Sequence, residues 1–263
     1  MILAFGKFYR LLQILSLDVA FGAIALLRFY SHRFDFEISW QLCFAQGAAI
    51  WIVYTLDHLK DANADLASRR VRFVFHQLYK KSIRITLLVV LAGLLVVILR
   101  LDTRLVVGGV VIAVVSLLFL LFQKQLAKYG IKELVVALTY STGMLLIPFV
   151  QGNESAVLDF IFLFLISYCN LLLFSFFEHK EDLMDGFMSF STQFGKRRTT
   201  NFIMILLSVA FSLYFALLVH PYYIICILIY CTFLVFTHFY KVQRCYRWVG
   251  DGVFLLPFLW DWL

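Results

Sequence analysis

Apolar stretches of about 17 to 25 residues recur along almost the whole of this chain, and each is long enough to cross a bilayer as a helix. The chain has 263 residues, of which 63% are hydrophobic and 15% are charged. Soluble domains contain about 45–50% apolar and about 25% charged residues. Because only helices and closed barrels satisfy their backbone groups within lipid, we predict an all-α, polytopic membrane bundle that forms one integral membrane domain over residues 1–263.

The apolar runs and polar breaks predict nine transmembrane helices, arranged as two four-helix units and a short ninth helix. The predicted spans cover residues 8–30, 38–57, 83–101, 104–122, 133–151, 157–177, 199–219, 222–240 and 249–263. The first span is expected to stay in the protein, because Asp18 interrupts its apolar run and no cleavage site of small residues follows it. The ninth contains Asp251, Pro257 and Asp261, and we expect it to be tilted or to lie partly in the interface.

The basic residues predict the orientation of the bundle. With the N-terminus in the cytoplasm, 19 of the 23 Lys and Arg residues fall on the cytoplasmic side, as the positive-inside rule requires. The net charge of +7 is therefore an orientation signal, and no soluble basic face remains for nucleic acid. We expect a bacterial inner membrane protein whose functional site faces the cytoplasm.

The cysteines carry no functional signal. They are five in number, no pair has C-x-x-C spacing, and four lie inside apolar runs, where cysteine behaves as a small hydrophobic residue. They predict neither a metal site nor a redox site.

Two acidic clusters follow the second and the sixth predicted spans, so both are expected in cytoplasmic connections. The first cluster occupies residues 57–65 and has Asp57, Asp61 and Asp65 at every fourth position. The second occupies residues 178–186, where Glu178 and Asp182 are again four apart. Side chains with this spacing stack on one face of a helix, where like charges repel and favour a bound cation. Oxygen ligands shared with substrate phosphates are typical of Mg²⁺.

The two clusters resemble the paired aspartate-rich motifs of the UbiA superfamily of intramembrane prenyltransferases. The first resembles the signature N-D-x-x-D-x-x-x-D, and the second resembles D-x-x-x-D followed by Gly186, Ser189 and the run 194–196. The chain departs from the signature at three positions, where Asp57 replaces Asn and His58 and Glu178 each replace Asp. The resemblance covers nearly the whole chain in layout but only these two segments in residues.

The resemblance implies a Mg²⁺-dependent transfer of an isoprenyl group from an isoprenyl diphosphate to a small lipophilic or aromatic acceptor. The implied metal ligands and catalytic residues are Asp61, Asp65, Glu178 and Asp182. The implied substrate-binding residues are Asp57, His58, Arg69, Arg70, Lys124, Lys132, Asp185 and Lys196. Cations among these residues and the metal would neutralise the leaving diphosphate. We also expect Asp61 and Asp182 to share one Mg²⁺–diphosphate cluster.

Two other functions remain open at the level of the sequence. An intramembrane terpene cyclase would ionise the same diphosphate but let the isoprenyl chain attack itself. A non-catalytic, lipid-binding relative would keep the fold without turnover, and the histidine at position 58 favours this alternative. Membrane lipid is the expected surrounding in every case.

Overall fold

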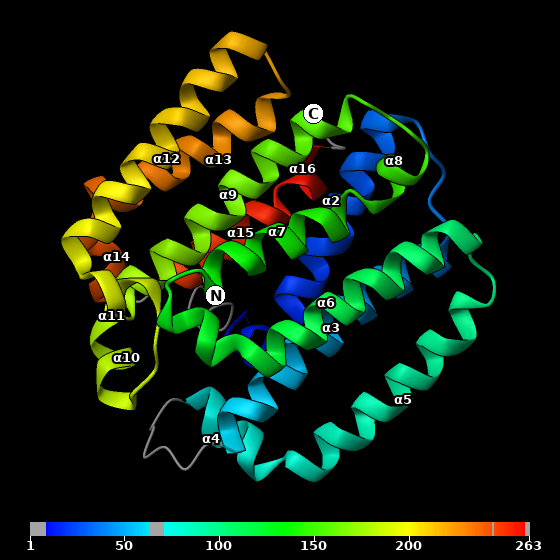
Figure 1. The fold of residues 1–263 in the computed structure, drawn as a ribbon, viewed down its shortest axis with the longest axis horizontal. Helices are drawn as coiled ribbons and strands as arrows, with labels where there is room; N and C mark the ends of the chain where they lie inside the picture. The colour runs from blue at the N-terminus through cyan, green and yellow to red at the C-terminus, as the bar shows by residue number, and fades with distance from the viewer. Residues whose placement is uncertain (1–8, 64–70, 244, 261–263) are drawn as a thin grey trace. The chain divides into compact units, whose positions relative to one another are not determined.

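The computed structural model describes residues 9–63, 71–243 and 245–260, and every regular element in these ranges is helical (Figure 1). The predicted all-α fold class is therefore confirmed for the described residues. The chain divides into two compact units, one formed by residues 1–113 and 254–263 and the other by residues 114–253. The division falls inside helix α6 (Thr103–Lys128), which contributes to both units.

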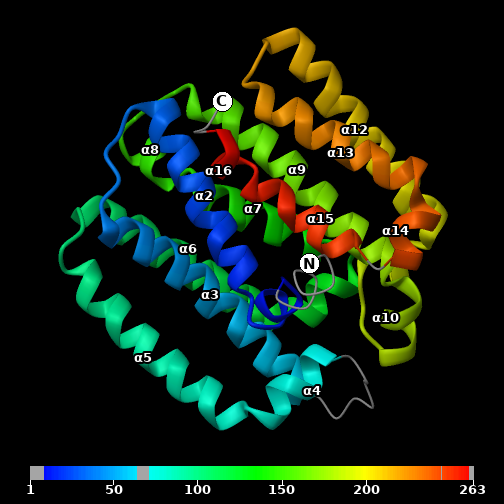
Figure 2. The same ribbon diagram turned by 180° about the vertical axis from the view of Figure 1, so that it is seen from behind.

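Helix α3 is central to the first unit. It packs against α2 on one side and against α4 and α5 on the other, and α16 packs against α2 (Figures 1 and 2). The helices of this unit are α2 (Leu17–Phe34), α3 (Trp40–Asn63), α4 (Val71–Leu78), α5 (Lys80–Ile98) and α16 (Pro257–Trp260). Ala23, Ala25 and Leu26 of α2 are fully buried. The indole Nε1 of Trp51 donates to the carbonyl oxygen of Leu15 at 2.9 Å and ties α3 to the entry of α2.

Helix α9 has the same central position in the second unit, where it packs against α7, α11, α12, α13 and α15. The elements of this unit are α7 (Lys132–Met144), α8 (Leu146–Val150), α9 (Ala156–Phe177), α10 (His179–Asp185), α11 (Phe190–Phe194), α12 (Lys196–Leu217), α13 (Pro221–Val235), α14 (Thr237–Gln243) and α15 (Tyr246–Gly252). The 3-10 turn Val253–Leu255 follows α15. Tyr223 of α13 donates from its hydroxyl to the buried Asp159 of α9 at 2.6 Å.

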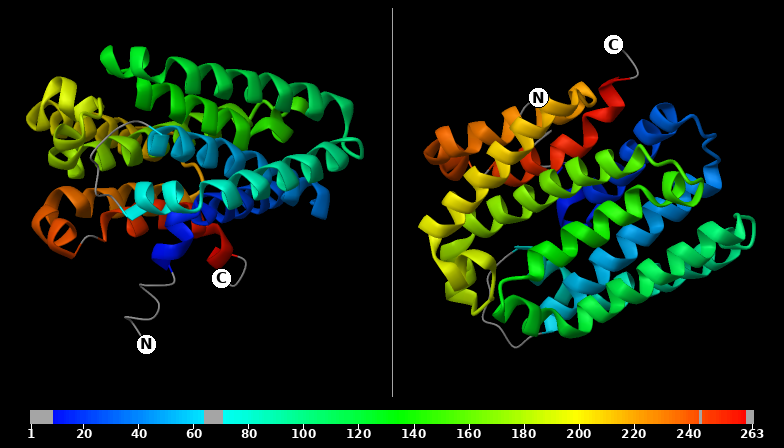
Figure 3. Two further views of the ribbon diagram at one scale, coloured as in Figure 1. Left: turned by 90° about the horizontal axis from the view of Figure 1, so that it is seen from below. Right: turned by 45° about the horizontal axis from the view of Figure 1, so that its top comes forward.

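Five of the described helices are long and apolar enough to cross a membrane, and a sixth results if α13 and α14 count as one span. The five are α3, α5, α6, α9 and α12. The apolar window of α9 is 67% buried, whereas the windows of α5 and α6 are each 11% buried. Helix α9 is thus a core helix, while α5 and α6 expose apolar side chains of the kind that lipid would cover. Figure 3 shows the short turn that joins α5 to α6.

The predicted count of nine membrane helices is not confirmed, because several predicted spans are interrupted or short. The span 133–151 is divided into α7 and α8, and Pro148 explains the break, since proline cannot donate to the carbonyl of Met144 and its ring clashes there. The span 222–240 is bent by 86° between α13 and α14. The span 249–263 consists of short helical pieces in its described part.

Candidate functional site

The first acidic cluster lies at the end of α3, which continues beyond the predicted span to Asn63. Asp57 and Asp61 are both in this helix, one turn apart, and both side chains are partly exposed. The following helix α4 returns against α3, and Gln77 Nε2 donates to the carbonyl oxygen of Ala62 at 2.7 Å. That bond satisfies one of the backbone carbonyls left without partners at a helix C-terminus. Asp65, Arg69 and Arg70 lie outside the described residues.

The predicted phosphate contact His58 points into the first unit. Its side chain is 5% exposed, and its Nδ1 lies 3.1 Å from the hydroxyl of Ser16, before the start of α2. The ring of His58 also meets the ring of His76 of α4 edge-on, with 5.1 Å between the ring centroids. The imidazole therefore holds together three segments of the first unit, while Asp57 and Asp61 on the same helix remain accessible.

The second acidic cluster lies where α9 ends and α10 begins. Glu178 is the junction residue, and its carbonyl oxygen accepts from the backbone N–H of Asp182 at 2.8 Å, so the helical spacing of the two acids is kept. Helix α10 ends at Gly186, which has φ +68°, a conformation that glycine adopts without strain. Asp182 and Glu178 are mostly buried, and Asp185 is partly exposed.

Both carboxylate oxygens of Glu178 are bound by Arg247 of α15. The Nη2 atom of Arg247 donates to Oε2 at 2.7 Å, and its Nε donates to Oε1. The hydroxyl of Tyr246 also donates to Oε1, at 3.2 Å. Burial raises the pKa of the Tyr246 phenol, and the Glu178 carboxylate raises this pKa further, so the phenol remains a neutral donor at physiological pH. The guanidinium also lies over the ring of Phe174, 5.0 Å from its centroid.

A buried carboxylate that sequence reasoning did not select, Glu133, accompanies the second cluster. Glu133 lies in the first turn of α7, and its Oε1 accepts from the backbone N–H of Phe190 at 2.8 Å, which fixes the start of α11. Its carboxylate lies close enough to Asp182 for the two charges to repel each other. The sequence did contain a signal for Glu133, because an acid at the edge of an apolar run is rare and indicates a functional or structural role.

The short helices α10 and α11 follow the end of α9 (Figure 1) and are connected by polar contacts. His179 Nδ1 lies 2.6 Å from the hydroxyl of Ser191, and the backbone N–H of Ser191 donates to the hydroxyl of Ser175 at 2.8 Å. The backbone N–H of Ser189 donates to the hydroxyl of Thr192 at 2.8 Å at the start of α11. Position 189, which the family motif includes, is therefore fixed here through its backbone.

The predicted phosphate-binding lysines of this unit differ in their surroundings. Lys124, in α6, is exposed, and Lys132, in the first turn of α7, is partly exposed. Lys196 begins α12, and its ammonium group lies over the ring of Phe176, 4.7 Å from its centroid. It also interacts electrostatically with Lys241 of α14 and with Glu181 and Lys180 of α10. Lys196 therefore lies near the second cluster, together with other lysines.

The carboxylates fit Mg²⁺ by their chemistry, because hard cations prefer oxygen ligands. Among the described residues, no three His, Cys, Asp or Glu side chains are grouped closely enough to hold a metal ion by themselves. Mg²⁺ commonly takes only one or two carboxylates and completes its shell with water and substrate phosphates. The pair Asp57 and Asp61 meets this requirement within one helix. Whether Asp61 and Asp182 share a cation depends on how the two units are placed, and it stays a prediction.

No protein-family model, curated protein or solved structure matches this chain. The resemblance to the UbiA superfamily therefore continues to depend on the two acidic motifs and on the order of apolar segments around them.

Proposed function

We propose that this protein is a Mg²⁺-dependent prenyltransferase of the UbiA type, which moves an isoprenyl group from its diphosphate to a small lipophilic or aromatic acceptor. The observation that carries the proposal is the pair of acidic clusters, each at the end of a long apolar helix that leads into it, α3 and α9. Asp57 and Asp61 are accessible on successive turns, and Glu178 and Asp182 retain the same spacing. Carboxylates in such numbers at helix ends need a cation nearby.

In this function the acids would hold Mg²⁺ against the diphosphate, and the metal would supply charge neutralisation for the leaving group. Asp61 would act from α3 together with Asp65, with Asp57 at the substrate, and Asp182 and Glu178 would act from the α9–α10 junction. Lys196 would add a point charge for phosphate oxygens. The exposed apolar faces of the long helices would keep the isoprenyl chain in a lipid-like environment.

The proposal includes an arrangement of nine spans with the N-terminus and both acidic clusters on the cytoplasmic side of a bacterial inner membrane. Helix α2, the pair α7–α8 and the C-terminal segment would then lie in the membrane beside the longer helices. The distribution of basic residues supports this orientation. Reporter fusions in the connection after α3 would contradict it if they reported a location outside the cytoplasm.

The decisive experiment measures binding of geranylgeranyl diphosphate to the purified protein, with Mg²⁺ and with a chelator. We expect binding to require Mg²⁺ and to weaken by about tenfold or more in Asp61→Asn and in Asp182→Asn, since each change removes a ligand charge and keeps the shape. Glu154→Gln is the matched control, because Glu154 is an exposed acid that belongs to neither acidic cluster. Equal, Mg²⁺-independent binding by all four proteins would refute the proposal.

Turnover is then followed as diphosphate release in membrane extracts that contain native acceptors. Asp61→Asn and Asp182→Asn are expected to reduce release by at least about a hundredfold. Release of a cyclic hydrocarbon or alcohol in the absence of any acceptor would instead identify a terpene cyclase.

A non-catalytic, lipid-binding relative is the second candidate, and one contact favours it. Arg247 occupies both oxygens of Glu178, one of the four proposed metal ligands, and thereby neutralises that carboxylate from within the protein. Such a protein would bind isoprenyl lipids without releasing diphosphate. Mass spectrometry of the lipid that co-purifies with the protein, combined with the release assay, separates the two candidates.

A further inference from the structure

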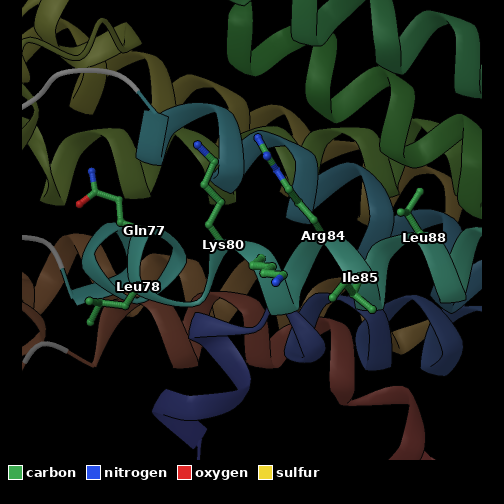
Figure 4. A pocket seen from close by; sticks show the side chains of 7 residues that line it. Gln77, Leu78, Lys80, Arg84, Ile85 and Leu88 are labelled. Carbon is green, nitrogen blue, oxygen red and sulfur yellow. The ribbon is translucent and has the colours of Figure 1, made fainter.

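An open groove in the first unit follows the junction of α4 and α5. Its volume is about 520 Å³. Its lining residues come from one continuous stretch and are Gln77, Leu78, Lys80, Lys81, Arg84, Ile85 and Leu88. Figure 4 shows Gln77, Lys80 and Arg84 projecting from the same side of this stretch. No residue of either acidic cluster is among the lining residues of the groove, and the inference does not depend on the proposed prenyl transfer.

The polar end of the groove is strongly cationic. It contains three basic residues and no acidic residue. Lys81 and Arg84 are exposed, and neither has an ion-pair partner within the part of the chain that the structure describes. The groove therefore has cationic groups directed at solvent and no internal counter-charge on its lining.

The basic residues of the groove lie at the N-terminal end of α5, where the helix itself adds partial positive charge. Lys80 and Lys81 are the first two residues of α5, whose first turn contains no acidic residue and whose N-terminus has no side-chain cap. A helix N-terminus carries partial positive charge and unpaired N–H groups, so cations there are destabilising and an anion is stabilising. The start of α5 thus combines a positive helix end, basic side chains and a groove.

The other end of the groove is apolar and continues along the exposed face of α5. Ile85 and Leu88 are 54% and 63% exposed, and the apolar window of α5 is only 11% buried. A free phosphate would leave this apolar end unused. An occupant that satisfies both ends has an anionic head and an aliphatic chain, and it lies along a helix that lipid already surrounds.

We propose that this groove binds one anionic phospholipid, with its phosphate between Lys81 and Arg84 and an acyl chain over Ile85 and Leu88. A zwitterionic lipid fits less well, because its ammonium group would meet the same three cations. Bound lipid would also hold α4 in place, and α4 carries Gln77, which binds the last turn of α3 beside Asp61.

The test is native mass spectrometry of the detergent-purified protein titrated with phosphatidylglycerol or phosphatidylcholine. The variant is Lys81→Gln/Arg84→Gln, and the matched control is Lys128→Gln/Arg198→Gln, which removes one exposed Lys and one exposed Arg at the end of α6 and the start of α12. We expect the wild type and the control to retain phosphatidylglycerol, and the variant to bind it about tenfold more weakly or worse. The charge-preserving variant Lys81→Arg/Arg84→Lys should bind as the wild type does.

Three results would overturn the proposal. The first is equal loss of phosphatidylglycerol in the variant and in the control, which would indicate general surface attraction. The second is equal retention of phosphatidylcholine and phosphatidylglycerol by the wild type. The third is displacement of bound phosphatidylglycerol by glycerol phosphate at equal concentration, which would assign the groove to a free phosphate compound.

Discussion

The guanidinium of Arg247 binds both carboxylate oxygens of Glu178, across 69 positions of sequence, and Tyr246 donates to the same carboxylate. This contact fixes α15 to the end of α9 at the point where the second acidic cluster begins. Figure 2 shows α15 running along α9. Glu178, which is predicted as a metal ligand, therefore has a structural function as well, because bidentate ion pairs between arginine and a carboxylate are among the stronger ones.

We predict that Arg247→Met destabilises the protein by about 1–3 kcal/mol, less than for a fully buried pair because the Arg247 side chain is 31% exposed. Methionine keeps the apolar contact with Phe174 but leaves the buried carboxylate without its guanidinium. Glu178→Gln should destabilise to a similar extent. Denaturant unfolding in detergent gives these values, with Arg198→Met as the control for an exposed arginine.

The double variant Arg247→Met/Glu178→Gln provides the critical comparison. Its destabilisation should be clearly smaller than the sum of the two single effects, because each single change leaves one partner uncompensated. Strictly additive effects would show that the two side chains do not stabilise each other.

We predict that His58→Ala weakens folding more than it weakens diphosphate binding. The imidazole is buried against the Ser16 hydroxyl and the His76 ring, so its removal leaves an unfilled space and a hydroxyl without this partner, at a cost of about 1–3 kcal/mol. His238→Ala, at an exposed position of α14, should leave stability unchanged. Unfolding and geranylgeranyl diphosphate titrations are compared on the same preparations. If His58→Ala lost affinity for geranylgeranyl diphosphate but kept normal stability, His58 would be a substrate-binding residue instead.

The sequence predicted the features that depend on local pattern. Apolar length predicted α3, α5, α6, α9 and α12, and the spacing of four predicted that Asp57 and Asp61 share a helix. Each of these features is determined by residues within a few turns of one another, so a single sequence is sufficient.

The features that sequence reasoning missed depend on contacts between distant segments. Arg247 was counted only as one of many cytoplasmic charges, because nothing near it in sequence indicates Glu178 as its partner. Glu133 had the signal of an acid beside an apolar run, but its contact with Phe190, 57 positions away, could not be predicted from local sequence. The 86° bend after α13 has no proline at its break, and Tyr240 of α14 stacks on Phe233 of α13 across it.

We predict that the first unit loses stability as the pH falls below about 6.5. Burial lowers the pKa of His76 in α4, and the nearby charge of Arg72 lowers it further, although a hydrogen bond from the ring to the Arg72 carbonyl oxygen partly opposes this. A histidine with a lowered folded pKa is neutral in both states above about pH 6.5 and is protonated first in the unfolded state below it. The contribution of neutral His76 to the unfolding free energy is therefore complete above pH 6.5. Below that pH the unfolding free energy declines, by at most about 1.4 kcal/mol per pH unit, until the folded pKa is reached.

The contribution of His76 is isolated by comparison with His76→Phe. Unfolding free energies are measured from pH 8 to pH 5 in both proteins, and the difference between them should be constant above pH 6.5 and change below it. His58, whose ring faces His76, is present in both proteins. A difference that does not vary with pH would contradict the prediction.

The last prediction concerns Gly250 of α15, which packs against Asn170 and Phe174 of α9. A Cβ atom at this position would lie 2.5 Å from Asn170 Oδ1 and 2.8 Å from Cε1 of Phe174, both closer than van der Waals contact. Asn170 cannot move freely, because its Nδ2 donates to Asp251 at 3.1 Å, and Phe174 lies under the Arg247 guanidinium. Gly250→Ala should therefore destabilise the protein by about 1–3 kcal/mol through overpacking.

Gly109→Ala in α6 is the matched control, since a Cβ there would meet nothing within 4 Å and alanine favours a helix. The unfolding free energies of Gly250→Ala and Gly109→Ala are measured in detergent and compared with that of the wild type. Equal stability of the two would show that α15 can shift on α9 without cost, and that the contact between Arg247 and Glu178 is correspondingly loose.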